Sequence, residues 1–549
     1  MAVLSLLKGS DTSELRKHCM QRRTHLIERR QPWLDFSRQI AEELIPNRLP
    51  YLQDPHGITR AGEHNTHICD AVGHLALETA AAGVASGSMP PTSPWFGLSI
   101  RNVWSDDDDL RLYLDESQQR MLGMHNQSNA NHVLPELQKE WIAFGTAAAL
   151  LLEDDEDGHR IDPMTVGEYC IADDARGRVD TIYRDFTMTV GQLADEFGPD
   201  ALSTTARSAY ERQDFDLPIP CVHAIEPDRD GRNPEGDNPD LPWRSVYFEL
   251  TSGCDQVLAV RGFTRFPGLV WRMGKLPGSA YGYGRGQDAL PHLIRLRKMI
   301  YRYGQAMAEM ADPAVQIPAG LSAHEVRMLP GGKTSVFGQT PVTNLRQVTL
   351  RLAEMADAIE RTRQDIRDTL GATLVASLRR VTHQMTAREA DLRTSQDMTE
   401  WLPSLYRLSE ELLNPYVEWL WEIGTQAGLL PTPPESLAGQ VIDIEFTSPL
   451  ARKQRQAEVD AIVRTFAIAG EMAKLPQLAH ILDNLDVDTA LRKIAEIEGA
   501  PTSVLVPVEA VQKLRAARAQ QMQAQQQAAA AQQGVDIARS AADAQRLSA

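Results

Sequence analysis

The sequence predicts a mainly helical α+β fold divided into several domains. The chain has 549 residues, which is more than one ordinary core accommodates. Long segments in both halves carry apolar residues at every third or fourth position, and this spacing indicates helices. Residues 160–275 instead alternate in short runs between turn residues, which indicates strands. Helices on either side of a strand-rich middle are typical of an α+β chain.

Three helical segments are expected ahead of the strand-rich middle. The first covers about residues 12–44 and ends before Pro46. The second is rich in alanine and covers about residues 63–86. The third follows the acidic run 106–109 and is expected to continue to about residue 152. The N-terminal part is therefore expected to be helical almost throughout.

Short strands follow, where β-branched and aromatic residues alternate with polar ones. The expected strands include residues 178–186, 246–250, 257–260 and 269–273. A loop rich in Pro, Gly and Asp at 227–242 separates two of them.

Two helices with heptad-like apolar seams are expected on either side of a segment broken by proline and glycine. The first seam consists of Leu293, Leu296, Ile300, Tyr303, Met307 and Met310. The second consists of Val348, Leu352, Met355, Ile359, Thr362, Ile366 and Leu370. Seams this narrow predict either an antiparallel pair within a bundle or a hairpin that packs beside copies of itself. In the second case residues 312–345 form a small module at the tip.

The C-terminal part is expected to be helical with one strand. A long helix is predicted over 386–428, with kinks at Pro403 and Pro415 because proline lacks the amide hydrogen that a helix needs. A strand is expected at 441–446. The last hundred residues are predicted to be helical, and the Ala/Gln-rich tract 516–533 becomes a stable helix only when neighbouring copies support it.

Composition limits the possible partners. Lys and Arg number 56 and Asp and Glu 74, so the formal net charge is −18. Such a protein does not wrap DNA through a phosphate-neutralising surface, although it can surround DNA loosely. The five cysteines contain no C-x-x-C pair, which argues against a zinc knuckle or a disulfide framework and fits intracellular synthesis. No apolar run approaches the length of a membrane span, and no signal peptide is recognisable.

Phosphate-binding loops are incomplete, and no enzyme is expected. Gly332-Lys333-Thr334 ends like such a loop, but Arg327 stands where its first glycine belongs. The glycines of 268–275 have one residue too many between them, and we interpret both segments as turns. The glycine-rich run 282–286 precedes a helix and is expected to be a flexible joint. No nucleophile–base pattern is recognisable, so no catalytic residue is assigned.

Metal binding is not expected either. The candidates share one predicted helix and are His64, His67, Cys69 and His74. No carboxylate or further ligand completes a site among them. The acidic runs 106–109 and 153–157 lack the ligand pattern of a calcium loop and are expected to be solvated. No metal and no cofactor is therefore predicted.

Several short motifs, none of them specific alone, occur in a recognisable order. They are residues 29–33 (RRQPW), 85–91 (ASGSMPP), 94–98 (PWFGL), 281–286 (YGYGRG), 385–390 (MTAREA), 411–415 (ELLNP) and 447–452 (TSPLAR). In order and spacing this chain resembles the head-to-tail connector, or portal, proteins of short-tailed phages. The resemblance covers nearly the whole sequence.

The resemblance implies a portal fold with named parts. These are a wing at 1–284, a first stem helix at 285–311, a clip at 312–346, a second stem helix at 347–370, a tunnel loop at 371–385, a further wing helix and strand at 386–449, and a crown at 450–549. In such a fold the two seams belong to the stem helices and the broken module to the clip.

The resemblance also implies a function. Twelve copies are expected to form a ring at one capsid vertex, through which double-stranded DNA is packaged and ejected. Expected partners are the terminase large subunit, a tail adaptor, scaffolding protein and the major capsid protein, with no membrane. Another virion scaffold or tail-adaptor ring protein is an alternative. A packaging ATPase is the other, but it needs the phosphate loop that is missing here.

Four residues are candidates for contacts. Arg379 and Arg380, in the implied tunnel loop, are expected either to grip DNA phosphates or to pair with carboxylates of the wing or of a neighbouring copy. Lys333 and Arg327, in the implied clip, are candidates for docking partners. The bore of the stem is expected to be acidic or of mixed charge, because a continuous basic lining would trap DNA.

Overall fold

The computed structural model divides the chain into two compact units. One contains residues 1–86 and 124–423, and the other contains 87–123 and 424–549. The structure describes residues 10–53, 68–91, 93–100, 108–154, 158–228, 241–251, 256–311, 315–317, 343–344, 352–372, 400–434, 437, 442–473, 485–498 and most of 511–525. Within them it is mostly helical with antiparallel sheets, as the predicted α+β class requires.

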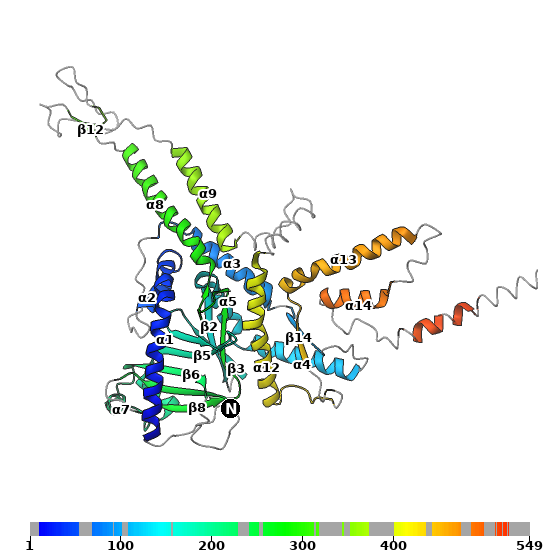
Figure 1. Ribbon diagram of the computed structural model, residues 1–549, viewed down its shortest axis with the longest axis horizontal. Helices are drawn as coiled ribbons and strands as arrows, with labels where there is room; N and C mark the ends of the chain where they lie inside the picture. The colour runs from blue at the N-terminus through cyan, green and yellow to red at the C-terminus, as the bar shows by residue number, and fades with distance from the viewer. Residues whose placement is uncertain are drawn as a thin grey trace, which may run out of the picture. The chain divides into compact units, whose positions relative to one another are not determined.

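A five-stranded antiparallel sheet forms the centre of the first unit (Figure 1). Its strands, in spatial order, are β4 (Tyr169–Asp173), β5 (Val179–Thr189), β6 (Pro218–Pro227), β7 (Trp243–Glu249) and β8 (Ala259–Phe263). The expected strands at 178–186, 246–250 and 257–260 are thus present with shifted ends. Alternate residues of β6 face opposite ways: Val222 lies in one core cluster and Cys221 in another.

Two sets of helices cover this sheet. The long helix α1 (Ser10–Glu43) lies along one face and buries Cys19 and Leu26 against Val222 and Phe248. On the other side, α6 (Val190–Phe197) and α7 (Thr204–Glu211) pack over Cys221. The predicted first helix is therefore confirmed, and its apolar residues serve the sheet.

The motif at residues 29–33 anchors α1. Arg30 is buried and donates to the carbonyl oxygens of Gly167 (2.8 Å) and Tyr169 (2.7 Å). The ring of Trp33 stacks on Tyr281, with centroids 4.5 Å apart. Short helical turns follow α1 at η1 (Pro46–Arg48) and α2 (Leu49–Gln53), so the predicted break at Pro46 is confirmed.

The third predicted helix differs from the structure. Two helices are present, α4 (Asp108–Gln127) and α5 (Ala130–Phe144), and residues 146–152 belong to strand β2 (Thr146–Asp154) instead. Gly145 ends α5 because its φ of 82° lies in the left-handed region. The apolar run after it fits a buried strand as well as a helix, since periodicity alone does not separate the two.

Strand β2 is the middle of a second antiparallel sheet. Its neighbours are β3 (Gly158–Met164) and β9 (Gly268–Arg272), the latter matching the strand expected at 269–273. Side chains from both sheets, among them Ile182 and Val270, share one apolar cluster. The second sheet thereby extends the core towards the base of the seam-bearing helices.

The alanine-rich helix begins later than predicted. Helix α3 spans Val72–Ser88, and Cys69 precedes it in a non-helical segment. Asp70 accepts a hydrogen bond from the amide of Val72 (2.9 Å), which favours a start there. The helix proposed to carry His64, His67, Cys69 and His74 is therefore wrong for Cys69, whereas His64 and His67 lie outside the described residues.

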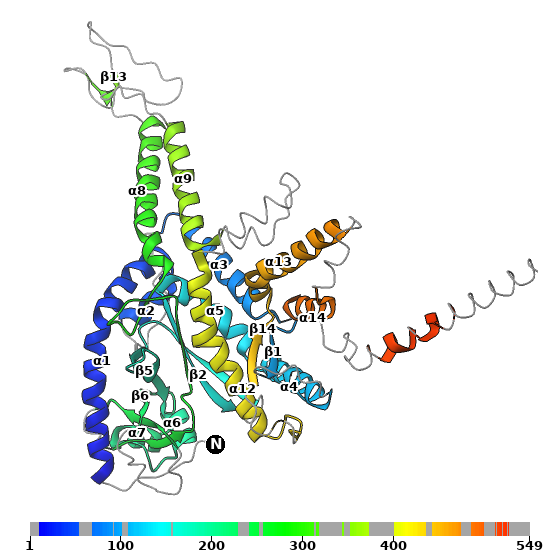
Figure 2. The ribbon, with the colours of Figure 1, turned by 45° about the vertical axis from the view of Figure 1, so that its right-hand side comes forward.

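The two seam-bearing helices form an antiparallel hairpin. Helix α8 (Arg285–Ala311) and helix α9 (Leu352–Leu370) lie side by side and lead away from the sheets (Figure 2). Near their base the seams are buried, for example at Leu296 and Ile366. Towards the tip the seam opens, and Met310 is 56% exposed. Two short strands, β12 (Val315–Gln316) and β13 (Thr343–Asn344), pair beyond the helices.

The long C-terminal helix of the first unit contains an irregular turn. Residues 400–408 are α-helical, η3 (Ser409–Leu413) is a π-helical turn, and α12 (Asn414–Gln426) resumes the α-helix. The irregularity directly precedes Pro415, whose nitrogen cannot donate to the preceding turn. The predicted helix at 386–428 is thus confirmed from residue 400 onwards.

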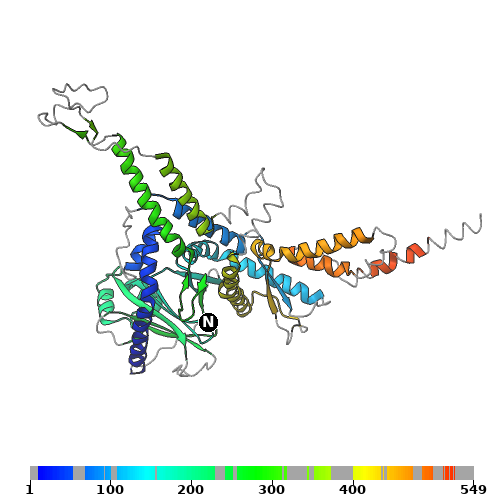
Figure 3. The same ribbon diagram turned by 45° about the horizontal axis from the view of Figure 1, so that its top comes forward.

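The second unit joins segments that are distant in sequence. Strand β1 (Phe96–Ile100) pairs antiparallel with β14 (Ile442–Phe446), the strand expected at 441–446. The rings of Trp95 and Phe446 are stacked. Helices α13 (Pro449–Ala473) and α14 (Val487–Glu498) pack on each other (Figure 3).

A buried carboxylate ties α1 to the five-stranded sheet. Glu226 accepts hydrogen bonds from Arg244 Nε and Tyr183 Oη, both at 2.9 Å, and lies 3.2 Å from Arg22 Nε of α1. Burial by itself raises the pKa of this carboxyl group, but Arg244 and the hydrogen bonds outweigh it and hold the pKa below its usual value.

Replacing Glu226 with Gln is expected to lower the free energy of unfolding by about 2–3 kcal/mol at neutral pH, because Arg244 loses its closest counter-charge and keeps only Asp228, 3.9 Å away. The folded-state pKa of Glu226 lies below the unfolded-state value, so its stabilisation is complete above the unfolded pKa and is lost as pH falls through the folded pKa. Urea unfolding between pH 7 and pH 3 measures this. The Gln variant should lose less stability on acidification than the parent, and an equal loss would contradict the assignment.

Candidate functional site: the joint at the base of the helical hairpin

The glycine-rich run 282–286 packs tightly against the end of α5. It begins as strand β11 (Gly282–Tyr283), which pairs with β10 (Gly274–Lys275). A Cβ atom on Gly284 would lie 2.6 Å from the carbonyl oxygen of Ile142, and one on Gly286 would clash with Ala143. The glycines therefore allow close backbone approach. The expectation of a flexible joint is wrong, because this segment is held on both sides.

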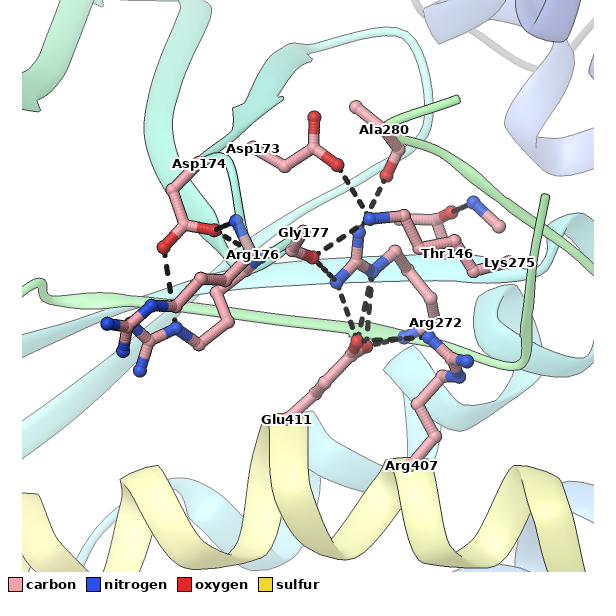
Figure 4. Close-up of polar contacts among 12 residues, drawn as sticks. Thr146, Asp173, Asp174, Arg176, Gly177, Arg272, Lys275, Ala280, Arg407 and Glu411 are labelled. Carbon is pink, nitrogen blue, oxygen red and sulfur yellow. Dashed lines mark hydrogen bonds and ion pairs between the residues drawn. The ribbon is translucent and has the colours of Figure 1, made fainter. Parts of the chain in front are cut away.

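Arg272 and Glu411 form the polar centre of the joint (Figure 4). The Arg272 side chain is 2% exposed and that of Glu411 16%. One Glu411 oxygen accepts from Arg272 Nη2 at 2.6 Å, and the other accepts from the Arg272 backbone amide at 2.7 Å. Glu411 belongs to the π-helical turn, so this pair fixes the irregular part of the long helix to the end of β9.

Two further contacts extend the polar centre to the turn between β4 and β5. The carbonyl oxygen of Gly177 accepts from Arg272 Nη2 and from Lys275 Nζ, both at 2.9 Å. Lys275 Nζ also donates to Asp173 at 2.6 Å. Figure 4 shows both cations converging on this carbonyl. Strands β4, β9 and β10, which all precede α8, are thus joined to one another and to the long helix through a few charged groups.

Arg285 joins three helices. It begins α8, its guanidinium lies 4.4 Å from the centroid of the Trp401 ring on the long helix, and its Nη1 is 3.5 Å from the carbonyl oxygen of Thr369 near the end of α9. Burial lowers the pKa of Arg285 below its usual value. At Gly371, where φ is 85°, an added Cβ would clash with Trp401. The start of α8 and the end of α9 therefore both lie against Trp401.

Ion pairs also hold the sides of the hairpin. Arg297 of α8 lies 2.6 Å from Glu43 at the end of α1. Arg363 of α9 lies 2.8 Å from Asp70, just ahead of α3. The hairpin is therefore tied to the end of α1 and to the segment just ahead of α3.

This arrangement is suited to mechanical coupling. Among the described residues, no group of three or more His, Cys, Asp or Glu side chains could hold a metal ion. In the same part of the chain, no helix has the length and apolar character to cross a membrane. What the joint offers is a rigid connection between a projecting hairpin and a folded body.

The site residues proposed from the sequence lie elsewhere. Arg379, Arg380, Lys333 and Arg327 all lie outside the described residues, so their roles stay predictions. Sequence reasoning missed Arg272 and Glu411, which are 139 positions apart. The only available signal was Glu411 within the motif at 411–415, and it did not indicate a partner.

Comparisons with known proteins agree on one family. The family model described as "Bacteriophage head to tail connecting protein" matches residues 16–505. The chain is 32% identical over 529 residues to a probable portal protein of Bordetella phage BPP-1, covering 95% of this chain and 94% of that protein. It is 31% identical over 519 residues to the portal protein of Salmonella phage epsilon15, covering 93% and 92%.

Replacing Arg272 with Met is expected to lower the free energy of unfolding by about 3 kcal/mol, because Glu411 loses its closest and most buried counter-charge and keeps only Arg407, 3.5 Å away and more exposed. The pair of Arg265 and Glu418, whose acid lies on the same long helix, provides a matched control, since the two side chains are 41% and 51% exposed. Replacing Arg265 with Met should change stability by no more than about 1 kcal/mol. Denaturant unfolding measures both, and equal effects would show that the Arg272 pair is not essential to the joint.

Proposed function

This chain belongs to the family of bacteriophage head to tail connecting proteins, and from this premise we propose how its parts serve the work of a portal protein. Portal function is common to the family and to both relatives. Portal proteins are virion components at the capsid vertex, where they form oligomeric rings that meet capsid, terminase and tail partners. The family is structural, and we propose that this chain catalyses no reaction.

The proposed assembly is a ring of twelve copies with an axial channel. The genome enters the capsid through this channel during packaging and leaves through it during ejection. The hairpin of α8 and α9 supports this proposal, because the seam of α8 is buried at its base but exposed towards the tip. Apolar side chains such as Met307 and Met310 gain burial when copies stand side by side.

The proposed roles of the domains follow the domain boundaries expected from the sequence. Residues 1–284 form the wing, and the two stem helices at 285–311 and 347–370 carry the clip between them. The paired strands β12 and β13 support a clip that leaves and re-enters the stem at one place. The clip, with Lys333 and Arg327, is the proposed docking surface for terminase and the tail adaptor. Residues 450–549 form the crown.

Charge supports a channel through which DNA slides. Duplex DNA carries about one negative charge per 1.7 Å of its axis, so an acidic or mixed lining avoids tight binding. The chain has a net charge of −18, and α8 and α9 each carry both signs. Arg379 and Arg380 of the proposed tunnel loop add a sparse basic ring that contacts phosphates.

Other assignments remain distinguishable by experiment. A packaging ATPase would hydrolyse ATP as a purified chain, whereas the proposed portal does not. Images of the purified chain separate a scaffold or tail-adaptor protein from a portal, because a ring of about a dozen copies with an axial hole supports the portal. Synthesis in the host cytoplasm, followed by assembly with scaffolding and major capsid proteins, fits the cysteines, since the described ones form no disulfide with one another.

Negative-stain images of the purified full-length chain test the assembly. The expected particles are rings of twelve copies with an axial hole, and native mass measurement should give about twelve times the chain mass of 61.0 kDa. Particles without a hole, or a chain that stays monomeric at the concentrations used for imaging, would contradict the ring.

Replacing both Arg379 and Arg380 with Ala is expected to reduce DNA packaging or retention while rings still assemble, because only the phosphate contacts are lost. The DNA content of filled heads measures the effect. Arg212, an exposed arginine at the end of α7, provides the control, since its replacement with Ala should leave packaging unchanged. Rings that fail to form would instead indicate that the two arginines pair with carboxylates.

A further inference from the structure

One flank of α8 carries a row of cations. Arg295, Lys298 and Arg302 are spaced three and four residues apart, which places them on one helix face, and all are exposed. Among the described residues, none of them has an acidic side chain within ion-pair distance, and Arg302 donates only to Gln305 (3.0 Å). By contrast, Arg297 of the same helix is paired with Glu43.

Helix α9 carries the opposite charge. It has five acidic and three basic residues, whereas α8 has two acidic and five basic. Asp357 and Asp365 are exposed, and in the part of the chain that the structure describes neither is paired with a cation. The acid Glu360 already lies within 3.2 Å of both Arg363 and Arg367. The free acids of α9 thus match the free cations of α8.

The two charged faces are not the faces that hold the hairpin together. Leu296, Ile359 and Ile366 are buried within it. A groove of about 240 Å³ between the helices is lined by Met299, Glu354, Met355, Ala358 and Ile359. Arg295 and Arg302 on α8 and Asp357 and Asp365 on α9 therefore remain available for another molecule.

The cations of α8 and the acids of α9 also lie at matching heights along the hairpin. Met299 borders residues 355–359 and lies 3.8 Å from Thr362 Oγ1, so these positions are level. Because the helices run antiparallel, Arg302 is then about level with Asp357, and Arg295 with Asp365. The two cations are separated by about 10 Å along α8 and the two acids by about 12 Å along α9, at 1.5 Å per residue.

We propose that α8 of one copy packs against α9 of the next copy in the ring, with Arg302 facing Asp357 and Arg295 facing Asp365. This inference rests on the proposed ring. Copies in a closed ring are related by rotation without a rise, so residues at equal height meet when the hairpin runs along the ring axis. A second copy of this chain supplies both the opposite charge and the matching height.

The same register places two cations opposite each other. Lys298 lies between Arg295 and Arg302 on α8, and Arg361 lies at the same height between the two acids of α9. Attraction at both ends of the seam therefore flanks repulsion in its middle. This makes the effect of a charge reversal depend on position: reversal at Arg302 weakens assembly, whereas reversal at Lys298 strengthens it.

Charge reversal in the full-length chain tests the seam. Arg302→Glu and Asp357→Lys are each expected to raise the concentration for half-assembly at least about fivefold, as for loss and inversion of an exposed ion pair. The double variant restores the pair and should return within about twofold of the parent. Sedimentation at low salt measures assembly, and differences should shrink at 1 M salt, where the Debye length is about 3 Å.

Lys298→Glu is the matched control, since it makes the same reversal on the same face one turn away. It should lower the concentration for half-assembly, and unchanged thermal unfolding of all variants separates assembly from folding. The pairing is wrong if the double variant assembles no better than the single ones, or if single reversals assemble like the parent; rings then persist without this seam. A parent chain that forms no ring overturns both the seam and the proposed assembly.

Discussion

The buried contact between Arg272 and Glu411 determines how the hairpin of α8 and α9 is attached to the rest of the first unit. A charged pair removed from water stabilises a fold only when its hydrogen bonds are complete, and here the backbone amide of Arg272 and the carbonyl of Gly177 complete them. The π-helical turn displaces Glu411 from the regular helical path. The irregular turn before Pro415 therefore has a structural role, because it places the Glu411 carboxylate beside the end of β9.

Close backbone packing beside this pair explains why the base of α8 is stiff. The glycines at 282–286 lie against Ile142 and Ala143, and Arg285 holds Trp401 and the end of α9 together. Stiffness matters for a projecting element, since a hairpin on a loose joint could neither keep neighbouring copies in register nor transmit force from its tip. The Arg272–Glu411 pair fixes the position of the hairpin base, and the glycines allow its backbone to pack closely against α5.

Local periodicity predicted the elements but not their partners. Seams at spacings of three and four marked α8 and α9, and alternation marked β5, β7 and β9, because those patterns follow from helix and strand geometry. The strand at Thr146 was missed because an apolar run of that length suits either structure. Pairing of β1 with β14 joins residues some 346 positions apart, and Arg272 lies 139 positions from Glu411. Such contacts depend on the whole fold, and no local pattern records them.

The proposed charged seam also suits a protein that is made as a single chain and functions as a ring. A broad apolar face on the hairpin would associate in many registers before assembly. Opposite charges at matched heights favour one register, and each pair contributes little by itself. Closure into a ring then repeats the same contact around the axis, so weak pairs become sufficient together. In this proposal the apolar seam, buried at the base, holds each hairpin together, and Arg295, Arg302, Asp357 and Asp365, which have no ion-pair partner among the described residues, set the register between copies.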